Sequence, residues 1–406
     1  MRELKGPSMD ILKDKNVVIG VTGSIAAYKI ATLCSMLKKR GANTTVIMTK
    51  NALNFINPIT FETLTGNKCL VDTFDRNFQY DVEHVELAKA ADVFLIAPAS
   101  ANVIAKAANG LADDMLTTTF LATACAKLVS PAMNTRMYNN QITQDNMAKL
   151  EHYGIKVIKP ATGYLACGDV GEGKMPEPEE LLEHIVYAIT EKDLVGKKIL
   201  VTSGGTKEKL DPVRFITNNS TGKMGFAIAR AAYLRGAEVT LVYGNVSVPV
   251  PIGPKAVKID SAADMAEAIK EVYKEQDIII KAAAVADYTP ETVSSEKVKK
   301  SDDDMSLPLK RTEDILGFLG KNRRNGQVLC GFSMETEHML ENSQKKLEKK
   351  NVDMIVANNV KVSGAGFGTD TNVVTFITKE LVEELPIMSK DDVANRLLDR
   401  LVKING

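Results

Sequence analysis

Residues 16–50, NVVIGVTGSIAAYKIATLCSMLKKRGANTTVIMTK, have the pattern of a strand, a helix and a second strand. The apolar run Val17–Val21 meets a turn of small residues, apolar residues then recur at helical spacing, and a β-branched run follows at Thr44–Met48. A crossover helix returns the chain to the same edge of a sheet, so that the two strands run parallel. The segment therefore predicts an α/β fold with a parallel sheet.

The same pattern recurs in the second half, beginning at KKILVTSGG, residues 197–205. Both copies have a Val-Thr pair at the end of the first strand and an Arg-Gly-Ala before the next one. Thr22 and Gly41 are 19 positions apart, whereas Thr202 and Gly236 are 34 positions apart. We expect the additional residues, 207–221, to form a loop at the carboxyl edge of the sheet, where ligands bind in such folds.

Further apolar runs of strand length alternate with helical patterns along the chain. Its 406 residues exceed what one hydrophobic core usually organises, so two or three domains are expected. We place the boundary at about residue 193 and predict two α/β domains, residues 1–192 and 193–406. The remaining buried strands are expected within residues 92–100, 126–134, 155–160, 277–288, 327–333 and 353–359.

The composition is that of a globular protein with no charged partner. Apolar residues make up 45%, charged residues 25%, and the formal net charge is zero, which argues against nucleic acid or an anionic membrane as a partner. No signal-peptide core is present and no apolar run approaches the ~20 residues of a membrane span, so we expect a cytoplasmic protein. The five cysteines are scattered without a C-x-x-C pair, which disfavours disulfides and structural zinc.

Two loops in the first half are suited to anions. Gly23–Ala27 follows a strand and opens a helix, so its backbone N–H groups could hold a phosphate, although a plain tight turn is the alternative. Ala97–Ser100 ends another strand, and Thr49 ends the strand between them in sequence. Together they favour a nucleotide-like ligand.

In the second half, Asn218–Met224 superficially resembles a P-loop. Thr217 stands where that motif needs glycine, and Met224 replaces the Ser or Thr that would bind Mg²⁺, so we reject a Walker A site. A polar turn before a helix still suits phosphate or carboxylate recognition.

Several charged residues have both a functional and an ordinary interpretation. His84 lies in a predicted helix and is either an active-site residue or a surface or core histidine; no metal-ligand spacing surrounds any of the four histidines. Lys297, Lys299 and Lys300 lie either in a solvated loop or in an arm that closes over a nucleotide triphosphate. Lys346 and Lys350 share a helix face, which also suits ordinary salt bridges.

Residues 165–178, LACGDVGEGKMPEP, place Cys167 in a polar loop with three glycines. A thiol in such a loop is usually there to react or to bind, because a structural cysteine usually lies in an apolar core.

Taken together, these motifs resemble the bifunctional phosphopantothenoylcysteine decarboxylase and phosphopantothenate–cysteine ligase family of coenzyme A biosynthesis. The resemblance extends over residues 14–403 and rests on motifs that occur in order across both halves: HVELAKAAD, PAMNTRM, ACGDVGEGKM, LDPVRFITNNSTGKMG, AAVADY and EKVKK. It implies two Rossmann-like three-layer domains with mainly parallel sheets, the first of them flavodoxin-like.

For the first half, the resemblance implies an FMN-dependent decarboxylase. His84 matches an essential histidine that acts as a base or orients substrate, Asn134 matches the residue that holds the substrate carboxylate, and Cys167 matches the proton donor on a clamp. The residues that match FMN contacts are Gly23, Ser24, Ile25, Thr49 and Ser100.

The chemistry explains why such groups are needed. Loss of CO₂ from a cysteinyl carboxylate would leave a carbanion without an electron sink. Oxidation of the thiol to a thioaldehyde by FMN lets those electrons delocalise onto sulfur as an enethiolate. An acid then protonates carbon and the reduced flavin returns its hydride, so the thiol of Cys167 must be protonated when the clamp closes.

For the second half, the resemblance implies ligation of cysteine to 4′-phosphopantothenate through an acyl-cytidylate formed from CTP, with Mg²⁺ neutralising the phosphates. Asn218 matches the residue acting on that intermediate, and Lys297 matches the flexible-loop lysine needed to form it. No metal ligand can be assigned. The residues that match CTP contacts are Lys281, Ala282, Ala283, Asp287, Lys297, Glu313, Asp314, Ile315, Leu316, Phe332, Lys346 and Lys350.

Two positions depart from the family pattern. Thr312-Glu313 stands where Asn-Pro is common before Asp-Ile, and Lys174 stands where an arginine is common.

The resemblance also implies a homo-oligomer, with trimers of the decarboxylase half linked by dimers of the ligase half. The alternatives are a flavin-binding regulatory protein without turnover and a flavin enzyme that decarboxylates peptide cysteines, which the ligase half argues against.

Overall fold

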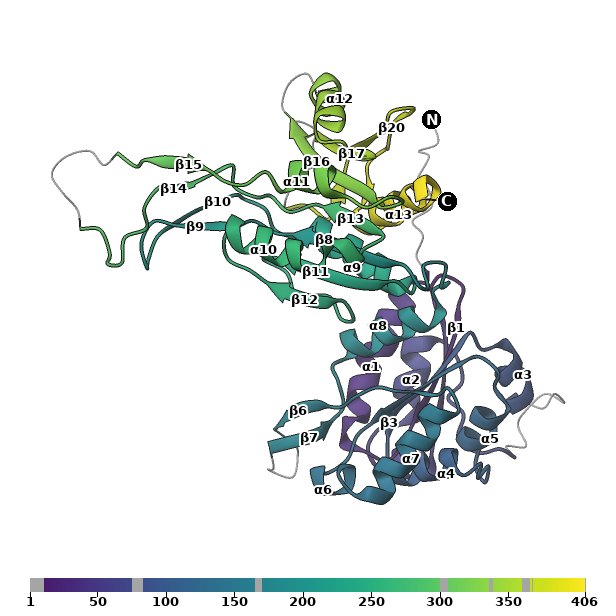
Figure 1. Cartoon of the computed structure of the whole chain (residues 1–406). Helices are drawn as coiled ribbons and strands as arrows, with labels where there is room; N and C mark the ends of the chain where they lie inside the picture. Colours follow the sequence, from purple (N-terminus) through teal and green to yellow (C-terminus); the bar gives the residue numbers. More distant parts are fainter. Residues whose placement is uncertain are drawn as a thin grey trace. The chain divides into compact units, whose positions relative to one another are not determined.

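The computed structural model describes residues 11–74, 83–164, 170–299, 306–335, 339–359, 366 and 368–405. They form two compact units, one ending at Thr190 and the other beginning at Glu191, and each has its own main sheet (Figure 1). The division of the activities at residue 193 stays a prediction.

The sheet of the amino-terminal unit has five parallel strands in the order β2-β1-β3-β4-β5. This is the flavodoxin-like order 2-1-3-4-5, which confirms the predicted fold class. Strand β3 is buried along its whole length, which explains its unbroken apolar sequence. The strands are β1 (Asn16–Val21), β2 (Asn43–Met48), β3 (Val93–Ala99), β4 (Ala126–Pro131) and β5 (Lys156–Val157), with the antiparallel hairpin β6 (Ala161–Tyr164) and β7 (Val170–Lys174).

Helices α4, α5 and α7 pack on one face of this sheet, where Phe94 and Val129 belong to one buried hydrophobic cluster with Ile104, Phe120 and Leu150. Helices α1 and α8 pack against each other, and α8 also contacts β3 and β4 (Figure 1). Helix α3 confirms the helix predicted around His84. The helices are η1 (Ile25–Ala27), α1 (Tyr28–Lys39), η2 (Lys50–Asn54), α2 (Pro58–Thr65), α3 (Glu83–Ala90), α4 (Ala101–Ala108), α5 (Met115–Ala122), α6 (Thr135–Tyr138), α7 (Gln141–His152) and α8 (Pro178–Ile189).

The carboxyl-terminal unit has an eight-stranded sheet in the order β12-β11-β8-β13-β16-β17-β19-β20. Its first six strands are parallel and follow the Rossmann order 3-2-1-4-5-6, whereas β19 and β20 are antiparallel. The strands are β8 (Lys198–Ser203), β11 (Glu238–Tyr243), β12 (Lys255–Lys258), β13 (Ile278–Lys281), β16 (Val328–Glu335), β17 (Met354–Asn359), β19 (Val374–Ile377) and β20 (Val382–Glu384), and β18 (Thr371–Asn372) pairs with β21 (Met388–Ser389).

The expectation that residues 207–221 form only a loop is wrong. Strands β9 (Lys207–Lys209) and β10 (Phe215–Thr217) pair as a hairpin because the Asp211 carboxylate accepts hydrogen bonds from the backbone amides of Val213 and Arg214, both at 2.8 Å, which closes the turn. A second hairpin, β14 (Tyr288–Pro290) and β15 (Leu309–Arg311), contacts the first one (Figure 1).

Two hydrophobic clusters cover the faces of this sheet. One contains the buried side chains of α9 and α13, and the other contains those of α10, α11 and α12. The helices are α9 (Lys223–Leu234), α10 (Ala262–Val272), η3 (Tyr273–Glu275), α11 (Ile315–Asn322), α12 (Met339–Lys349) and α13 (Lys390–Asn405). Within the described ranges, no helix has the length and apolar content that a bilayer crossing requires.

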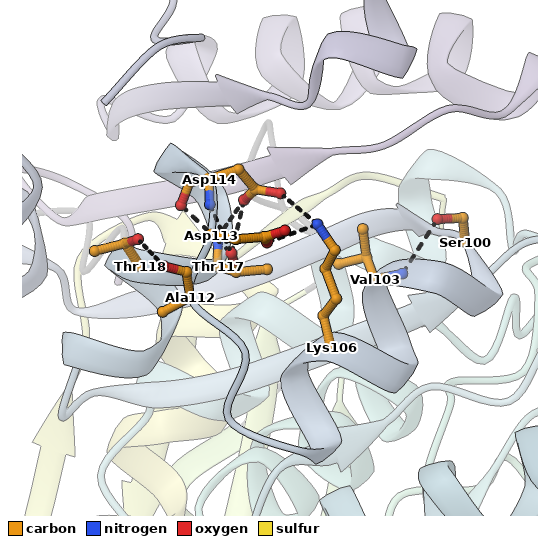
Figure 2. A network of polar contacts seen from close by, with 8 residues as sticks. All are labelled: Ser100, Val103, Lys106, Ala112, Asp113, Asp114, Thr117 and Thr118. Carbon is orange, nitrogen blue, oxygen red and sulfur yellow. Dashed lines mark hydrogen bonds and ion pairs between the residues drawn. The ribbon is translucent and has the colours of Figure 1, made fainter. Parts of the chain in front are cut away.

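A polar network joins α4 to α5 in the amino-terminal unit (Figure 2). Asp114 is the N-cap of α5, and its carboxylate accepts hydrogen bonds from the amide and the hydroxyl of Thr117, both at 2.8 Å. Lys106 of α4 lies 2.7 Å from Asp113 and 3.2 Å from Asp114. Burial raises the pKa of Asp114, but the hydrogen bonds from Thr117 and Lys106 outweigh it and hold that pKa below its ordinary value. Through Lys106, the network holds the carboxyl-terminal turn of α4, and Ser100 caps the amino-terminal end of the same helix.

We expect Asp114→Ala to lower the free energy of unfolding by about 1–2 kcal/mol near neutral pH, because α5 loses its N-cap. A carboxyl group whose pKa is lowered by folding stabilises the fold above its unfolded pKa of about 4, and this contribution is lost as the pH falls through the folded pKa. Urea unfolding of the full chain should therefore show wild type and variant converging in acid. Asp113→Ala is the control, since this exposed carboxylate should contribute about 0–1 kcal/mol. A stability difference that persists undiminished in acid would contradict the assignment.

Candidate functional site

In the amino-terminal unit, Thr22 joins two neighbouring strand ends. It follows β1, and its fully buried hydroxyl donates to the carbonyl oxygen of Pro98 at 2.7 Å and accepts from the amide of Ser100 at 2.9 Å. Strands β1 and β3 are the neighbours between which the strand order reverses. In open α/β sheets, ligands bind beside the carboxyl ends of the strands at this reversal point.

A cavity of about 430 Å³ lies beside this reversal point. It brings together Gly23, Ser24 and Ile25 after β1, Ser100 after β3, and Asn134 after β4. All five were selected from the sequence. The cavity is also lined by residues that the sequence did not indicate, among them Lys29, Met133, Tyr164, Gly173 and Met175.

The loops around this cavity are suited to a phosphate. Thr49 ends β2, and its Oγ1 is buried with no hydrogen-bond partner among the described residues. A Cβ at Gly23 would lie 2.9 Å from the Cβ of Asn51, so the turn after β1 packs closely against the segment after β2. Ser24 caps the helical turn that follows, accepting from the amide of Ala26 at 3.3 Å. Backbone N–H groups and hydroxyls at a helix start are an ordinary phosphate-binding arrangement, so these residues fit a ligand with a phosphate.

Three predicted residues of this unit are not placed in this cavity. Thr49, at the end of β2, does not line it. His84 is half-buried on α3 and does not line it. Cys167 lies between β6 and β7 in the sequence, outside the described residues. Lys300 of the other unit also lies outside the described residues.

Lys29 is a cavity residue that sequence reasoning missed. It is only 6% exposed, and its ammonium donates to the carbonyl oxygen of Met175 at 3.1 Å and to the Glu177 carboxylate at 2.8 Å. Its position in the first turn of α1 gave no sign that it would be buried.

The carboxyl-terminal unit repeats the threonine contact. The buried hydroxyl of Thr202, at the end of β8, accepts from the amide of Ala283 at 3.1 Å, beyond the end of β13. The amide of Ala284 donates to the carbonyl oxygen of Gly204 at 2.9 Å. Strands β8 and β13 are the neighbours where the strand order of this sheet reverses.

A cavity of about 530 Å³ lies at this second reversal point. Of the predicted residues, Asn218, Ala282, Ala283, Asp287 and Phe332 line it. The turn 218–222 is held in place because the amide nitrogen of the Asn218 side chain donates to Ala284 at 3.0 Å and the Ser203 hydroxyl donates to Gly222 at 2.8 Å.

The turn also needs glycine at position 222. Gly222 has φ +79°, and a Cβ there would lie 2.4 Å from Val246 Cγ1.

Asn358, which sequence reasoning missed, also lines the cavity, and its Oδ1 is buried with no partner among the described residues. The cavity therefore offers polar groups to a ligand.

Three predicted lysines gather beside this cavity. Lys346 donates to the carbonyl oxygen of Phe332 at 3.0 Å, and Lys350 forms an ion pair with Asp314. Removal from water and then the positive charge of Lys346 lower the pKa of Lys281 to about 8. The cluster is therefore suited to a polyanion.

The remaining predicted nucleotide contacts are less favourably placed. Lys297 is exposed and does not line the cavity; its neighbour Val298 donates through its amide to Asp211 at 3.2 Å, which holds this segment against the hairpin β9–β10. Glu313 pairs with Lys270 at 2.6 Å and borders a different, open hollow. The side chains of Ile315 and Leu316 are buried in the core, which leaves only their backbone available to a ligand.

Among the described residues, no group of three or more His, Cys, Asp or Glu side chains is arranged to hold a metal ion.

Comparison with known proteins gives a match for each half. Residues 6–190 match the family described as Flavoprotein, and residues 194–404 match the DNA/pantothenate metabolism flavoprotein C-terminal domain.

Several relatives that match over nearly their whole length share one name. The coenzyme A biosynthesis bifunctional protein CoaBC of Bacillus subtilis strain 168 is 47% identical over 97% of this chain and 98% of its own, and that of Vibrio vulnificus strain YJ016 is 42% identical over 98% and 100%. A cysteine/cysteine sulfinic acid decarboxylase from an unknown prokaryote is 42% identical over 86% of this chain and 99% of its own. With near-complete coverage at this identity, the chain belongs to the family of the coenzyme A biosynthesis bifunctional proteins CoaBC.

Proposed function

We propose that this chain performs two consecutive steps of coenzyme A biosynthesis. The first is CTP-dependent ligation of cysteine to 4′-phosphopantothenate through an acyl-cytidylate, and the second is FMN-dependent decarboxylation of 4′-phosphopantothenoylcysteine to 4′-phosphopantetheine. One observation carries the proposal: a single chain of the CoaBC family holds two separate cavities, each at a strand-order reversal and each lined by five of the predicted residues.

We assign decarboxylation to residues 1–192 and ligation to residues 193–406. The two family matches, which end at residue 190 and begin at residue 194, support this division.

In the decarboxylase half, FMN would be held by Gly23, Ser24 and Ile25 with the hydroxyls of Thr49 and Ser100. The buried hydroxyl of Thr49, which has no partner among the described residues, supports this assignment. A buried hydroxyl without a hydrogen bond is unfavourable, and a bound ligand would supply the missing hydrogen bond. Bound FMN supplies a two-electron acceptor for the substrate thiol.

The other residues of this half act on the substrate. Asn134 would hold the substrate carboxylate from the wall of the cavity, and its amide is oriented by the cap it forms with the amide of Arg136 at 2.8 Å. Cys167 would donate a proton to carbon after CO₂ has left, and His84 would orient substrate or accept a proton.

In the ligase half, the cavity wall formed by Ala282, Ala283, Asp287 and Phe332 would hold CTP. The cluster of Lys281, Lys346 and Lys350 would attract its phosphates, since opposing cations favour a polyanion. Asn218 would act on the acyl-cytidylate, and Lys297 would assist its formation from the neighbouring arm. Glu313, Asp314, Ile315 and Leu316 would contribute mainly through the backbone at the start of α11.

Mg²⁺ would enter with the nucleotide, because this ion commonly keeps its waters and binds through substrate phosphates and one or two carboxylates.

We also propose a homo-oligomer in which trimers of decarboxylase halves are linked by ligase dimers. The cytoplasmic location stays a prediction.

Thr49→Val should weaken FMN binding by about tenfold, because it removes one hydrogen bond to the phosphate. Thr44→Val is the matched control: its hydroxyl is also buried and unpartnered, but it lies at the other end of β2. FMN affinity can be measured by equilibrium dialysis of the apoprotein. Equal losses in both variants would argue against the phosphate site.

Cys167→Ser should still release CO₂ from 4′-phosphopantothenoylcysteine but form at least about 100-fold less 4′-phosphopantetheine, because carbon loses its acid. The oxidised, decarboxylated intermediate should accumulate, as mass spectrometry of quenched reactions would reveal. Cys125→Ser, at a half-buried cysteine that borders a different cavity, should behave like wild type. Normal product formation by Cys167→Ser would refute the assigned role.

Lys297→Gln should slow pyrophosphate release by at least about 100-fold in the presence of CTP, cysteine and 4′-phosphopantothenate, because a positive charge at the transferring phosphate is lost. Lys299→Gln, two residues along the same exposed segment, should change the rate by less than about threefold. If both variants release pyrophosphate at the wild-type rate, Lys297 has no part in forming the acyl-cytidylate.

A further inference from the structure

Residues 282–287 border the cavity of the ligase half, and side chains from other segments hold their backbone. The amide of Ala286 donates to the fully buried hydroxyl of Thr206 at 3.1 Å. The carbonyl oxygen of Ala286 accepts from the hydroxyl of Thr312 at 2.6 Å. Thr206 precedes β9 and Thr312 follows β15, so threonines from two distant segments hold both polar groups of this one residue.

Thr312 bonds to two successive carbonyl oxygens. Its hydroxyl donates to that of Ala286, and its amide donates to that of Asp287 at 3.0 Å. The hairpin β14–β15 pairs Tyr288 with Arg311, and Thr312 is the next residue beyond this pair. The two bonds hold the peptide groups on either side of the α-carbon of Asp287. They therefore fix the direction in which the Asp287 side chain leaves the backbone.

The bond from the hydroxyl is not easily replaced. Ala286 is only 8% exposed, so water has limited access to its carbonyl oxygen once the hydroxyl is removed. Its amide is held by Thr206, which prevents the residue from turning toward another donor. Among the described residues, the side chain of Thr312 is thus the group that completes the hydrogen bonding of this carbonyl.

Asp287, the residue held in this way, lines the cavity together with Ala282 and Ala283. Removal from water lowers the pKa of Lys281, and the negative charge of Asp287 opposes that shift, so the two groups lie close enough to interact. A carboxylate repels phosphates. Its partners on a bound nucleotide are therefore sugar hydroxyls, an amino group of the base or the accompanying Mg²⁺, whereas the lysines attract the phosphates.

We propose that Thr312 is a positioning residue for nucleotide binding: it holds the peptide groups on either side of Asp287, and so sets the direction of this carboxylate before the nucleotide arrives. This role rests on the proposed function, in which the nucleotide is CTP. A group that is already held in its bound direction costs less to order when the ligand binds, so loss of the hydroxyl weakens binding.

The test compares Thr312→Val, which removes the donor at nearly constant shape, with Thr312→Ser, which keeps it. Binding of CTP with Mg²⁺ to the full chain with FMN is measured by isothermal titration calorimetry, without the other substrates. We expect Thr312→Val to raise the Kd for CTP about tenfold and Thr312→Ser to stay within about twofold of wild type. In the pyrophosphate assay, Thr312→Val should raise KM for CTP about tenfold and leave kcat within about twofold.

Thr289→Val is the matched control. Thr289 lies on the same hairpin, opposite Lys310, and does not line the cavity. Removing its hydroxyl should leave the Kd for CTP within about twofold of wild type. This variant distinguishes loss of the specific bond from a general loosening of the hairpin.

A second set of variants tests whether Thr312 acts through Asp287. Asp287→Ala alone should weaken CTP binding at least about tenfold, because a direct contact is lost. In that background, Thr312→Val should cost less than about twofold further, because no carboxylate is left to position. If Thr312→Val merely destabilised the fold, its effect would persist in the double variant.

Three results would overturn the inference: wild-type CTP affinity in Thr312→Val, equal losses in Thr312→Val and Thr312→Ser, or losses that simply multiply in the Asp287 and Thr312 double variant. Wild-type protein that neither binds CTP nor releases pyrophosphate with the complete set of substrates would instead overturn the proposed function itself.

Discussion

The arrangement of both sites depends on one buried threonine in each half, placed where the strand order reverses. Thr22 holds Pro98 and Ser100, and Thr202 holds the amide of Ala283. Both side chains are fully buried, so replacing either hydroxyl would leave backbone groups unpaired at a cost of about 1–3 kcal/mol. The loops after two neighbouring strands are thereby fixed before any ligand binds, which lowers the ordering cost of binding.

Much of this arrangement could be predicted from the sequence because it is local. Apolar runs of strand length marked the buried parallel strands, and the Val-Thr pair repeated in both halves marked the two threonines. The repeated Arg-Gly-Ala also has a physical reason, since Gly41 and Gly236 adopt φ values of +77° and +92° that favour glycine at a helix end. The loops of Gly23 and Ser100 were expected to hold one ligand, and a single cavity does bring these two residues together.

The rest depended on partners distant in sequence, which no local pattern reveals. The hairpin β9–β10 is an exception, because the Asp211 carboxylate closes its turn through the amides two and three residues further along, in a polar segment expected to be a loop. The spacing of Lys346 and Lys350 suited ordinary salt bridges equally well, and it is Asp314 from another helix that pairs with Lys350. Nothing in the sequence marked Lys29 as buried, and Glu313 faces Lys270 because of how α10 packs.

The central claim is that the two cavities serve successive reactions of one chain, and the fate of the cysteine carboxyl group tests it most directly. The purified chain with FMN would receive cysteine labelled with ¹³C at the carboxyl carbon, and labelled CO₂ would be followed by mass spectrometry. The account predicts labelled CO₂ only when CTP, Mg²⁺ and 4′-phosphopantothenate are all present, with one pyrophosphate released for each CO₂. Labelled CO₂ from cysteine alone, or pyrophosphate release without any CO₂, would contradict it.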